Sequence, residues 1–219
     1  MSLTSLRELP PSLAKLPRAH GFPVPWFVCY FNGKPDFRVI DPVKRLRAMK
    51  QGLCWICGER LRPSKTFVLG PMCVIQRISY EPPSHPDCAE AAMRICPFLS
   101  MTEFARREAQ LPDPSKIETI PLMQSHNPGV HALWTTTAFR RDDTLVHVGA
   151  PSSVTWRSHG RPATRAEVCD ALKDAHARLE DKGHLPVLWL DELHREAIAL
   201  APPIRPKNDS CIDDETTIE

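Results

Sequence analysis

The chain has no long hydrophobic run, and this absence limits where it can reside. Its longest apolar stretches, such as Pro25 to Phe31, fall far short of the roughly 20 residues that cross a bilayer. The first residues, MSLTSLRELPPSLAKLPRAHG, carry charges and prolines where a secretory signal needs an unbroken apolar segment. We therefore expect a cytoplasmic protein without membrane contact, in which cysteines serve as metal ligands or buried thiols rather than disulfides.

Motifs of the common enzyme classes are also missing. There is no Walker phosphate-binding loop, no G-x-G-x-x-G, no G-x-S-x-G and no H-E-x-x-H. Glycine is scarce, with nine residues against 23 prolines, and clusters such as EPPSHP interrupt helices and favour extended or turn conformations. The 219 residues suffice for one substantial core, or for a modest core with a small second unit.

Charge is distributed unevenly along the chain. Residues 1–107 carry 16 Lys and Arg against 8 Asp and Glu, whereas residues 108–219 carry 12 against 18. A basic half suggests an acidic partner such as a nucleic acid. The alternative is a pair of oppositely charged lobes that attract each other.

A hairpin and a basic helix are expected near the N-terminus, after an arm formed by residues 1–20. Residues 26–40, WFVCYFNGKPDFRVI, predict two strands around an Asn-Gly turn. Residues 41–52 predict a helix that begins at an Asp N-cap and ends at Gly52. Its apolar residues share one face, Val43, Leu46 and Met49. Its basic residues, which we expect to bind a partner, are Lys44, Arg45, Arg47 and Lys50.

Two close pairs of cysteine and histidine follow this helix. Cys54 and Cys57 form a C-x2-C pair, and His85 and Cys88 form an H-x2-C pair after a gap of 27 residues. Four such ligands suit tetrahedral zinc, and a site with every position filled by protein is structural, since catalytic zinc needs an open position. Buried free thiols are the alternative, which the paired spacing disfavours.

The segment between the two pairs bears on the fold of this module. Residues 65–80, KTFVLGPMCVIQRISY, predict two strands around Gly70-Pro71, and Ser84 is the expected N-cap of a helix containing His85 and Cys88. A cysteine knuckle, a hairpin and a helix together form a treble-clef-like module. Treble clefs that act as HNH-type nucleases carry a histidine on the hairpin, and residues 65–80 contain none. Cys73 and Cys96 are expected in the core, although Cys73 in place of His85 is an alternative ligand.

Beyond a linker at residues 111–128, a small α+β unit is expected at residues 129–205. Strands are predicted in GVHALWTTTAF, TLVHVG and SSVTW. A helix with the capping box Thr164 and Glu167 follows, and a last helix runs from about Pro186 to Leu200. The whole chain is thus predicted to be α+β, with its hairpin, basic helix and zinc module at residues 21–110 and a disordered acidic tail at residues 206–219.

Further polar residues are candidates for binding, each with an ordinary structural alternative. Arg77, Ser79 and Glu81 could form a polar surface beside the zinc module, or Arg77 could pair with Glu81 to support the loop. Two arginines near a helix start, Arg161 and Arg165, could hold an anion unless the capping box already satisfies the free N–H groups. Four histidines lack metal-ligand spacing and are interpreted as incidental: His126, His131, His147 and His159.

A series of short motifs resembles a family of uncharacterised proteins encoded by bacteria and their phages. The motifs are HGFPVPWFV, GKPDFRVID, LCWICG, FVLGPMC, EPPSHPDCA, CPFL, NPGV and GRPATRAEV, spread over residues 20–200. The resemblance implies that the two halves belong to one protein of phage or mobile-element origin, and that the matching ligands are Cys54, Cys57, His85 and Cys88. It implies no activity.

Two functions are therefore compared. The first is a zinc-stabilised binding protein that holds a nucleic acid or an acidic face of a host protein, as an accessory or inhibitory factor in DNA metabolism or defence. The second is an enzyme with a site between the halves and zinc only as scaffold, built around Arg77, Glu81, Arg161 and Arg165. A deep pocket joining those four residues favours the enzyme, whereas a flat basic face favours binding.

Overall fold

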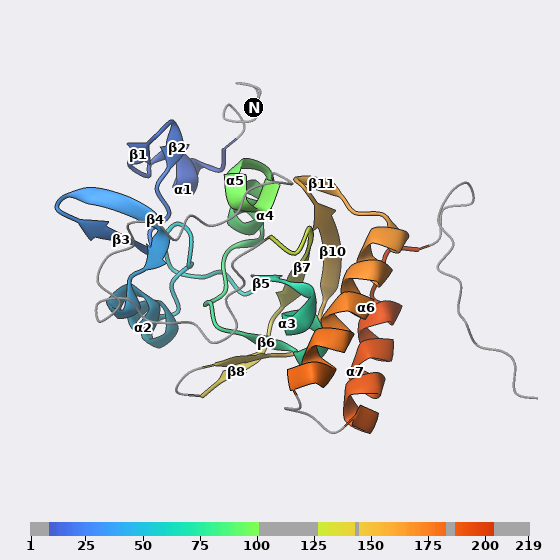
Figure 1. Cartoon of the computed structure of the whole chain (residues 1–219). Helices are drawn as coiled ribbons and strands as arrows, with labels where there is room; N and C mark the ends of the chain where they lie inside the picture. Colours follow the sequence, from blue (N-terminus) through green and yellow to red (C-terminus); the bar gives the residue numbers. More distant parts are fainter. Residues whose placement is uncertain (1–8, 101–126, 143–144, 183–186, 204–219) are drawn as a thin grey trace, which may run out of the picture.

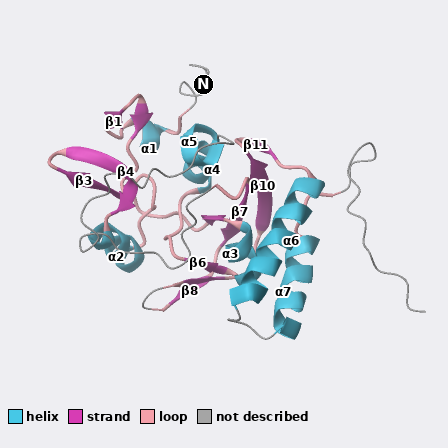
Figure 2. Cartoon of the chain, viewed as in Figure 1, coloured by secondary structure: helices cyan, strands magenta, loops and turns pink. Residues whose placement is uncertain are grey.

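The structure is a computed structural model that describes residues 9–100, 127–142, 145–182 and 187–203. The described chain is a mixed α+β protein with several small sheets, as predicted (Figure 1, Figure 2). No described helix is both long enough and apolar enough to cross a membrane. The acidic tail, most of the expected linker and the first residues of the N-terminal arm lie outside the described residues.

The described chain contains both helices and short strands. The helices are α1 (Pro11–Ala14), α2 (Pro42–Gln51), α3 (Pro71–Gln76), α4 (Pro86–Ile95), α5 (Pro97–Ser100), α6 (Arg165–Lys182) and α7 (Val187–Ala199). The strands are β1 (Arg18–Ala19), β2 (Phe22–Pro23), β3 (Val28–Phe31), β4 (Lys34–Ile40), β5 (Lys65–Leu69), β6 (Ile78–Ser79), β7 (Val130–Thr136), β8 (Phe139–Arg141), β9 (Val146–Val148), β10 (Ser153–Ser158) and β11 (Arg161–Pro162).

A four-stranded antiparallel sheet with the order β11-β10-β7-β5 forms the centre of the molecule (Figure 1). Its strand β5 comes from between the two predicted ligand pairs, and it pairs with β7 from beyond the predicted linker, with Phe67 opposite Trp134. The sheet therefore draws on both of the predicted units. Smaller sheets with the orders β6-β9-β8, β3-β4 and β1-β2 surround it.

The hairpin β3-β4 and the start of α2 confirm the local predictions. Asn32 and Gly33 turn the hairpin, with φ of 50° and 77°, which matches a turn that needs positive φ at both central residues. The Asp41 carboxylate accepts hydrogen bonds from two free N–H groups of the first turn of α2, at 2.9 and 3.1 Å. Gly52 ends the helix with φ of 64°.

The predicted hairpin at residues 65–80 is wrong in its second half. The chain forms strand β5, but Gly70 and Pro71 start the helix α3 instead of a turn. Proline suits this position because the first helical residue needs no N–H donor. The helix also buries Met72, Val74 and Ile75, whose β-branched members had suggested a strand, against the neighbouring helices.

Two of the three apolar residues predicted to share one face of α2 are exposed, and the third, Met49, packs against the main core. Val43 is 73% exposed and Leu46 is 52% exposed, whereas Arg45 and Ala48 are buried. The Arg45 guanidinium lies 3.8 Å from the centre of the Tyr80 ring and donates a hydrogen bond to the Tyr80 carbonyl at 3.0 Å. This ring and carbonyl compensate the buried charge. Helix α2 therefore contacts the segment of Tyr80 through Arg45.

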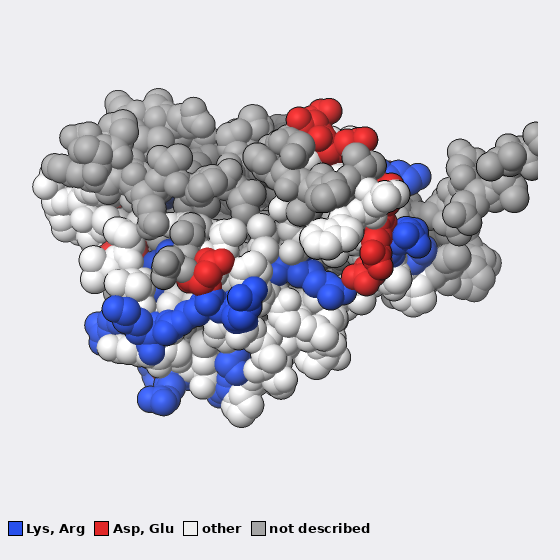
Figure 3. Space-filling view, turned by 90° about the horizontal axis from the view of Figure 1, so that it is seen from below, with Lys and Arg blue, Asp and Glu red and all other residues white. Residues whose placement is uncertain are grey.

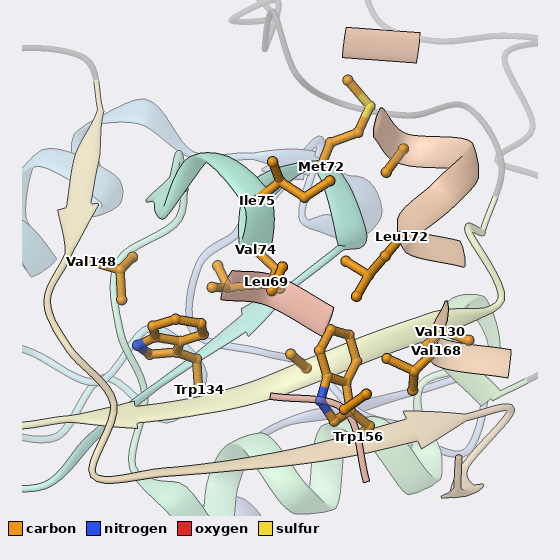
Figure 4. Packing of buried hydrophobic residues seen from close by; sticks show 14 of the residues in the cluster. Leu69, Met72, Val74, Ile75, Val130, Trp134, Val148, Trp156, Val168 and Leu172 are labelled. Atoms are coloured by element: carbon orange, nitrogen blue, oxygen red, sulfur yellow. The ribbon is translucent and has the colours of Figure 1, made fainter. Parts of the chain in front are cut away.

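One face of the central sheet carries the main core (Figure 4). Trp134 and Trp156 project from β7 and β10 toward α3, α6 and α7, where they meet residues such as Leu172. Each indole N–H is satisfied: that of Trp134 by the Gly149 carbonyl at 2.9 Å and that of Trp156 by the Leu200 carbonyl at 2.8 Å. Large aromatic burial with paired donors stabilises this layer.

The other face of the sheet is covered by α4. Ala89 and Met93 of this helix pack with Leu133, which alternates with Trp134 along β7 and therefore points the opposite way. Figure 1 shows α6 and α7 on one side of the sheet and α4 on the other. The helix that carries the predicted ligand Cys88 is thereby anchored on the core.

Candidate metal centre

The first ligand pair lies in a tight knuckle between α2 and β5. The Cys54 N–H donates to the Glu59 carbonyl at 2.7 Å, and the Gly58 N–H donates to the Cys54 carbonyl at 2.8 Å. Gly58 has φ of 76°, and a Cβ added there would lie 2.5 Å from the Trp26 ring. Only glycine fits this position, so the knuckle depends on the residue that follows the C-x2-C pair.

The second pair lies at the start of α4. Ser84, the predicted N-cap, instead makes a β-bridge with Thr66, with both N–H···O distances at 2.8 Å. His85 is the N-cap, one residue later, and Pro86 occupies the first helical position. Because Pro86 has no N–H and fixes its own φ, it starts the helix directly after the histidine and places Cys88 in the first turn.

The four predicted ligands meet in one buried cluster. One ligand atom from each of Cys54, Cys57, His85 and Cys88 lies within 4.8 Å of the others, and all four residues are buried. Zinc bonds of about 2.3 Å to sulfur place the ligands of a tetrahedral site roughly 4 Å apart, so this arrangement can hold a metal ion.

The histidine presents its Nδ1 atom to the cysteines. Nδ1 lies 3.5 Å from the Cys57 Sγ and 3.8 Å from the Cys88 Sγ, whereas Nε2 lies 3.0 Å from the Arg60 carbonyl. Since a carbonyl only accepts, Nε2 carries the proton and Nδ1 has a free lone pair. A backbone partner that fixes the tautomer is typical of histidines that bind metals.

The three thiols strongly influence one another. Hydrogen bonding from Cys57 and Cys88 lowers the pKa of Cys54, and its sulfur also accepts the His85 N–H at 3.4 Å. Hydrogen bonding to Cys54 raises the pKa of Cys57 to about 11 and also raises the pKa of Cys88. Several thiolates this close are mutually unfavourable without a cation, and a divalent metal would compensate their charge.

The remaining cysteines of this region lie apart from the cluster. Cys73 is in α3, not in a strand, and burial raises its pKa to about 12. Cys96 is the C-cap of α4, and burial raises its pKa as well. The cluster includes His85 and not Cys73, so the alternative ligand set is not the one the structure assembles.

The predicted basic surface of α2 is smaller than the sequence suggested. Arg45 is in the interior, and the Lys44 ammonium is held by the Val28 carbonyl at 2.7 Å. Arg47 and Lys50 are exposed. Figure 3, the view from below, shows Lys and Arg side chains gathered on the side of the molecule where α2 and β8 lie.

The other predicted polar residues do not come together. Arg77 pairs with Glu196 at 2.8 Å and not with Glu81, because its left-handed backbone at the end of α3 directs it to α7. The Ser79 hydroxyl is used by the backbone of Glu81, at 2.8 and 3.1 Å. The Arg165 guanidinium donates to the Pro202 carbonyl at 3.3 Å.

The capping box of α6 forms as predicted, and Arg161 binds its glutamate, Glu167. The Glu167 carboxylate accepts the Thr164 N–H at 2.8 Å and also binds Arg161 at 3.0 Å. The arginine holds the pKa of Glu167 at about 2. The Thr164 and Glu167 N–H groups and the Arg161 charge, which the sequence offered for anion binding, are therefore already engaged.

One feature could not be found from sequence motifs, a cavity of about 1090 Å³ between the N-terminal hairpin and the central sheet. Among its lining residues are Glu81, Cys73, Cys96 and His131. They come from separate elements, so no spacing rule links them, and the sequence alone gives His131 no assigned role. We call this the Glu81 cavity.

No family model matches the chain, no curated protein matches it significantly, and no solved structure matches it significantly.

Proposed function

We propose that the chain is a zinc-stabilised binding protein that docks the exposed face of α2 onto an acidic surface of a partner protein. The observation that carries this proposal is the composition of that face. Val43, Leu46, Arg47 and Lys50 are all exposed, and they recur at the spacing of a single helical face. We call these four residues the α2 face.

Zinc is proposed to have a structural role. The four ligands are protein side chains with little exposure, which leaves no position for water or substrate. A treble-clef-like module is supported by the knuckle, by the bridge between Thr66 and Ser84, and by the ligand-bearing first turn of α4. In this proposal, α3 and β6 form an insertion between the two segments that the bridge joins, one containing Thr66 and the other containing Ser84.

The mixture of residues on the α2 face favours a protein partner over a nucleic acid. Val43 and Leu46 are among the most exposed large apolar side chains of the described residues. Phosphate groups attract basic side chains but gain nothing from such apolar groups, whereas helix-in-groove recognition uses apolar anchors with charges beside them. The partner would present an apolar groove edged by Asp and Glu.

The resemblance to bacterial and phage proteins suggests what such a partner does. Under that resemblance the chain is a factor of phage or mobile-element origin that acts inside a bacterial host cell. We propose a host protein of DNA metabolism or defence as the partner, which the α2 face assists or inhibits.

The experiment is an affinity capture from host extract with tagged, zinc-loaded protein, with and without nuclease. The test variants are Arg47→Glu with Lys50→Glu, and separately Val43→Asp with Leu46→Asp. The matched control makes the same charge change on the exposed side of α6, with Lys173→Glu and Arg178→Glu. All proteins are first checked for zinc content and thermal unfolding.

We expect one protein in stoichiometric amount that survives nuclease and is lost from both α2-face variants but not from the α6 control. Nucleic acid that is recovered in low salt and lost with nuclease would refute the protein partner and support nucleic-acid binding, because phosphate contacts are salt-dependent. If all variants captured the partner equally, docking through the α2 face would be refuted.

The four residues that suggested an enzyme do not form a common site. Three of the four are engaged elsewhere: Arg77 with Glu196, Arg161 with Glu167, and Arg165 with the Pro202 carbonyl. Of the four, Glu81 alone is among the described residues that line the cavity.

A further inference from the structure

The Glu81 cavity contains polar groups that the proposed docking function does not use. The Glu81 backbone N–H and carbonyl both bond with the Ser79 hydroxyl, but its carboxylate makes no hydrogen bond or ion pair with any described residue. Glu81 is partly buried and lines the cavity, so its carboxylate is within reach of a ligand there.

A second group in the same cavity also has unused hydrogen-bonding capacity. His131 is 5% exposed and lines the cavity, and its Nδ1 atom has no hydrogen-bond partner among the described residues. Burial lowers the pKa of His131 to about 4, so its ring is neutral near pH 7 and adds no positive charge to the cavity.

The rest of the wall is mainly apolar and aromatic. Rings are contributed by separate elements and include Phe22, Phe27, Phe31, Phe37, Trp55 and Phe98. A cavity with an apolar wall and a few polar groups is the usual form of a site for a small molecule, and its polar groups fix the orientation of the ligand.

We propose that the Glu81 cavity binds a small, largely aromatic molecule that carries one basic nitrogen, which pairs with the Glu81 carboxylate. The aromatic wall takes the body of the ligand. The carboxylate selects the nitrogen, because a charge-assisted hydrogen bond removed from water is stronger than one between neutral groups. This site is separate from the α2 face and does not depend on the docking proposal.

The other charged residues that line the cavity are Lys34, Asp36 and Arg38, and Arg38 is paired with Asp36 at 2.6 Å. Burial raises the pKa of Glu81 to about 7, against the opposing effect of Arg45, and the two nearby thiols, Cys73 and Cys96, have raised pKa values and are uncharged near pH 7. Arg45 is held by the Tyr80 ring and carbonyl. A cation beside Glu81 would stabilise its ionised form.

The test uses three probes with the same ring system: naphthylmethylamine, naphthylmethanol and naphthoate. Binding to the zinc-loaded full chain is measured by titration calorimetry. We expect the amine to bind at least about tenfold more tightly than the alcohol, and the carboxylate to bind most weakly. Glu81→Gln should remove the preference for the amine but retain binding of the alcohol.

Two further variants make the result specific. Glu81→Asp keeps a carboxyl and should keep the preference, and Glu180→Gln changes an exposed carboxyl of α6 and should leave all three affinities unchanged. Equal binding of amine and alcohol to the wild-type chain would overturn the proposal. So would a preference that persists in Glu81→Gln, or the absence of binding by all probes up to about 1 mM.

Discussion

Replacing the Glu81 carboxyl by an amide, Glu81→Gln, should change how stability depends on pH. In the folded chain burial raises the pKa of Glu81 from 4.5 to about 7. The folded state therefore binds this proton more tightly than the unfolded state. It follows that Glu81 lowers the free energy of unfolding progressively as pH rises from the unfolded pKa near 4.5 through the folded pKa near 7.

The size of the effect follows from the same two values. Raising the pKa from 4.5 to about 7 corresponds to about 3 kcal/mol of unfolding free energy, reduced to the extent that water in the cavity solvates the carboxylate. For a chain of this length, such a loss is roughly 5–10 °C in Tm. Glutamine does not ionise, so the variant should not lose this unfolding free energy as pH rises.

The assay is urea unfolding of zinc-loaded wild-type and Glu81→Gln chains across the range from about pH 5 to about pH 8. Protonation of the metal ligands destabilises both proteins at the acidic end, so the difference between the two curves isolates Glu81. The variant should gain about 2–3 kcal/mol relative to the wild type over this range. Parallel curves would show that the carboxyl is hydrated in the folded chain and would refute its burial.

Other substitutions test the metal site and the interior. Cys57→Ala should abolish zinc binding measured by elemental analysis, whereas Cys73→Ala should bind as much zinc as the wild-type chain. Arg45→Ala should lower the free energy of unfolding by about 2–4 kcal/mol and Arg47→Ala by less than about 0.5 kcal/mol, because only Arg45 is buried against Tyr80. Gly58→Ala should cost at least about 2 kcal/mol in the same unfolding assay, since the added Cβ would overlap an indole ring. Chelation of zinc should abolish naphthylmethylamine binding in the calorimeter.

Features that depend on neighbouring residues could be predicted from the sequence. The Asn32-Gly33 turn, the Asp41 N-cap and the Thr164 capping box are set by local backbone geometry, and each forms in the structure. The cluster of four candidate ligands was predictable for a similar reason. A C-x2-C pair and an H-x2-C pair each place two ligands within one turn of the chain, so that only one long-range contact remains to be inferred.

Features that depend on distant residues could not be predicted in the same way. The helical pattern of α2 puts Val43 and Leu46 on one face but does not show that Arg45 is the residue that turns inward, because Tyr80, far along the chain, provides the ring and carbonyl that hold it. Likewise, α3 has the β-branched residues of a strand and becomes helical where α6 and α7 cover it. Tertiary contacts override propensity at both places.

Helix α4 connects the candidate metal centre to the Glu81 cavity, although none of the four candidate ligands is among the described residues that line it. Its first turn carries Cys88, its middle packs Met93 on the sheet, and its last turn supplies Ile95 and Cys96 to the cavity wall. A short helix of this length is not stable by itself and takes its position from its contacts. A metal ion bound by the cluster would fix the first turn and thereby position the cavity wall, so a buried structural zinc would control a binding site that it does not touch.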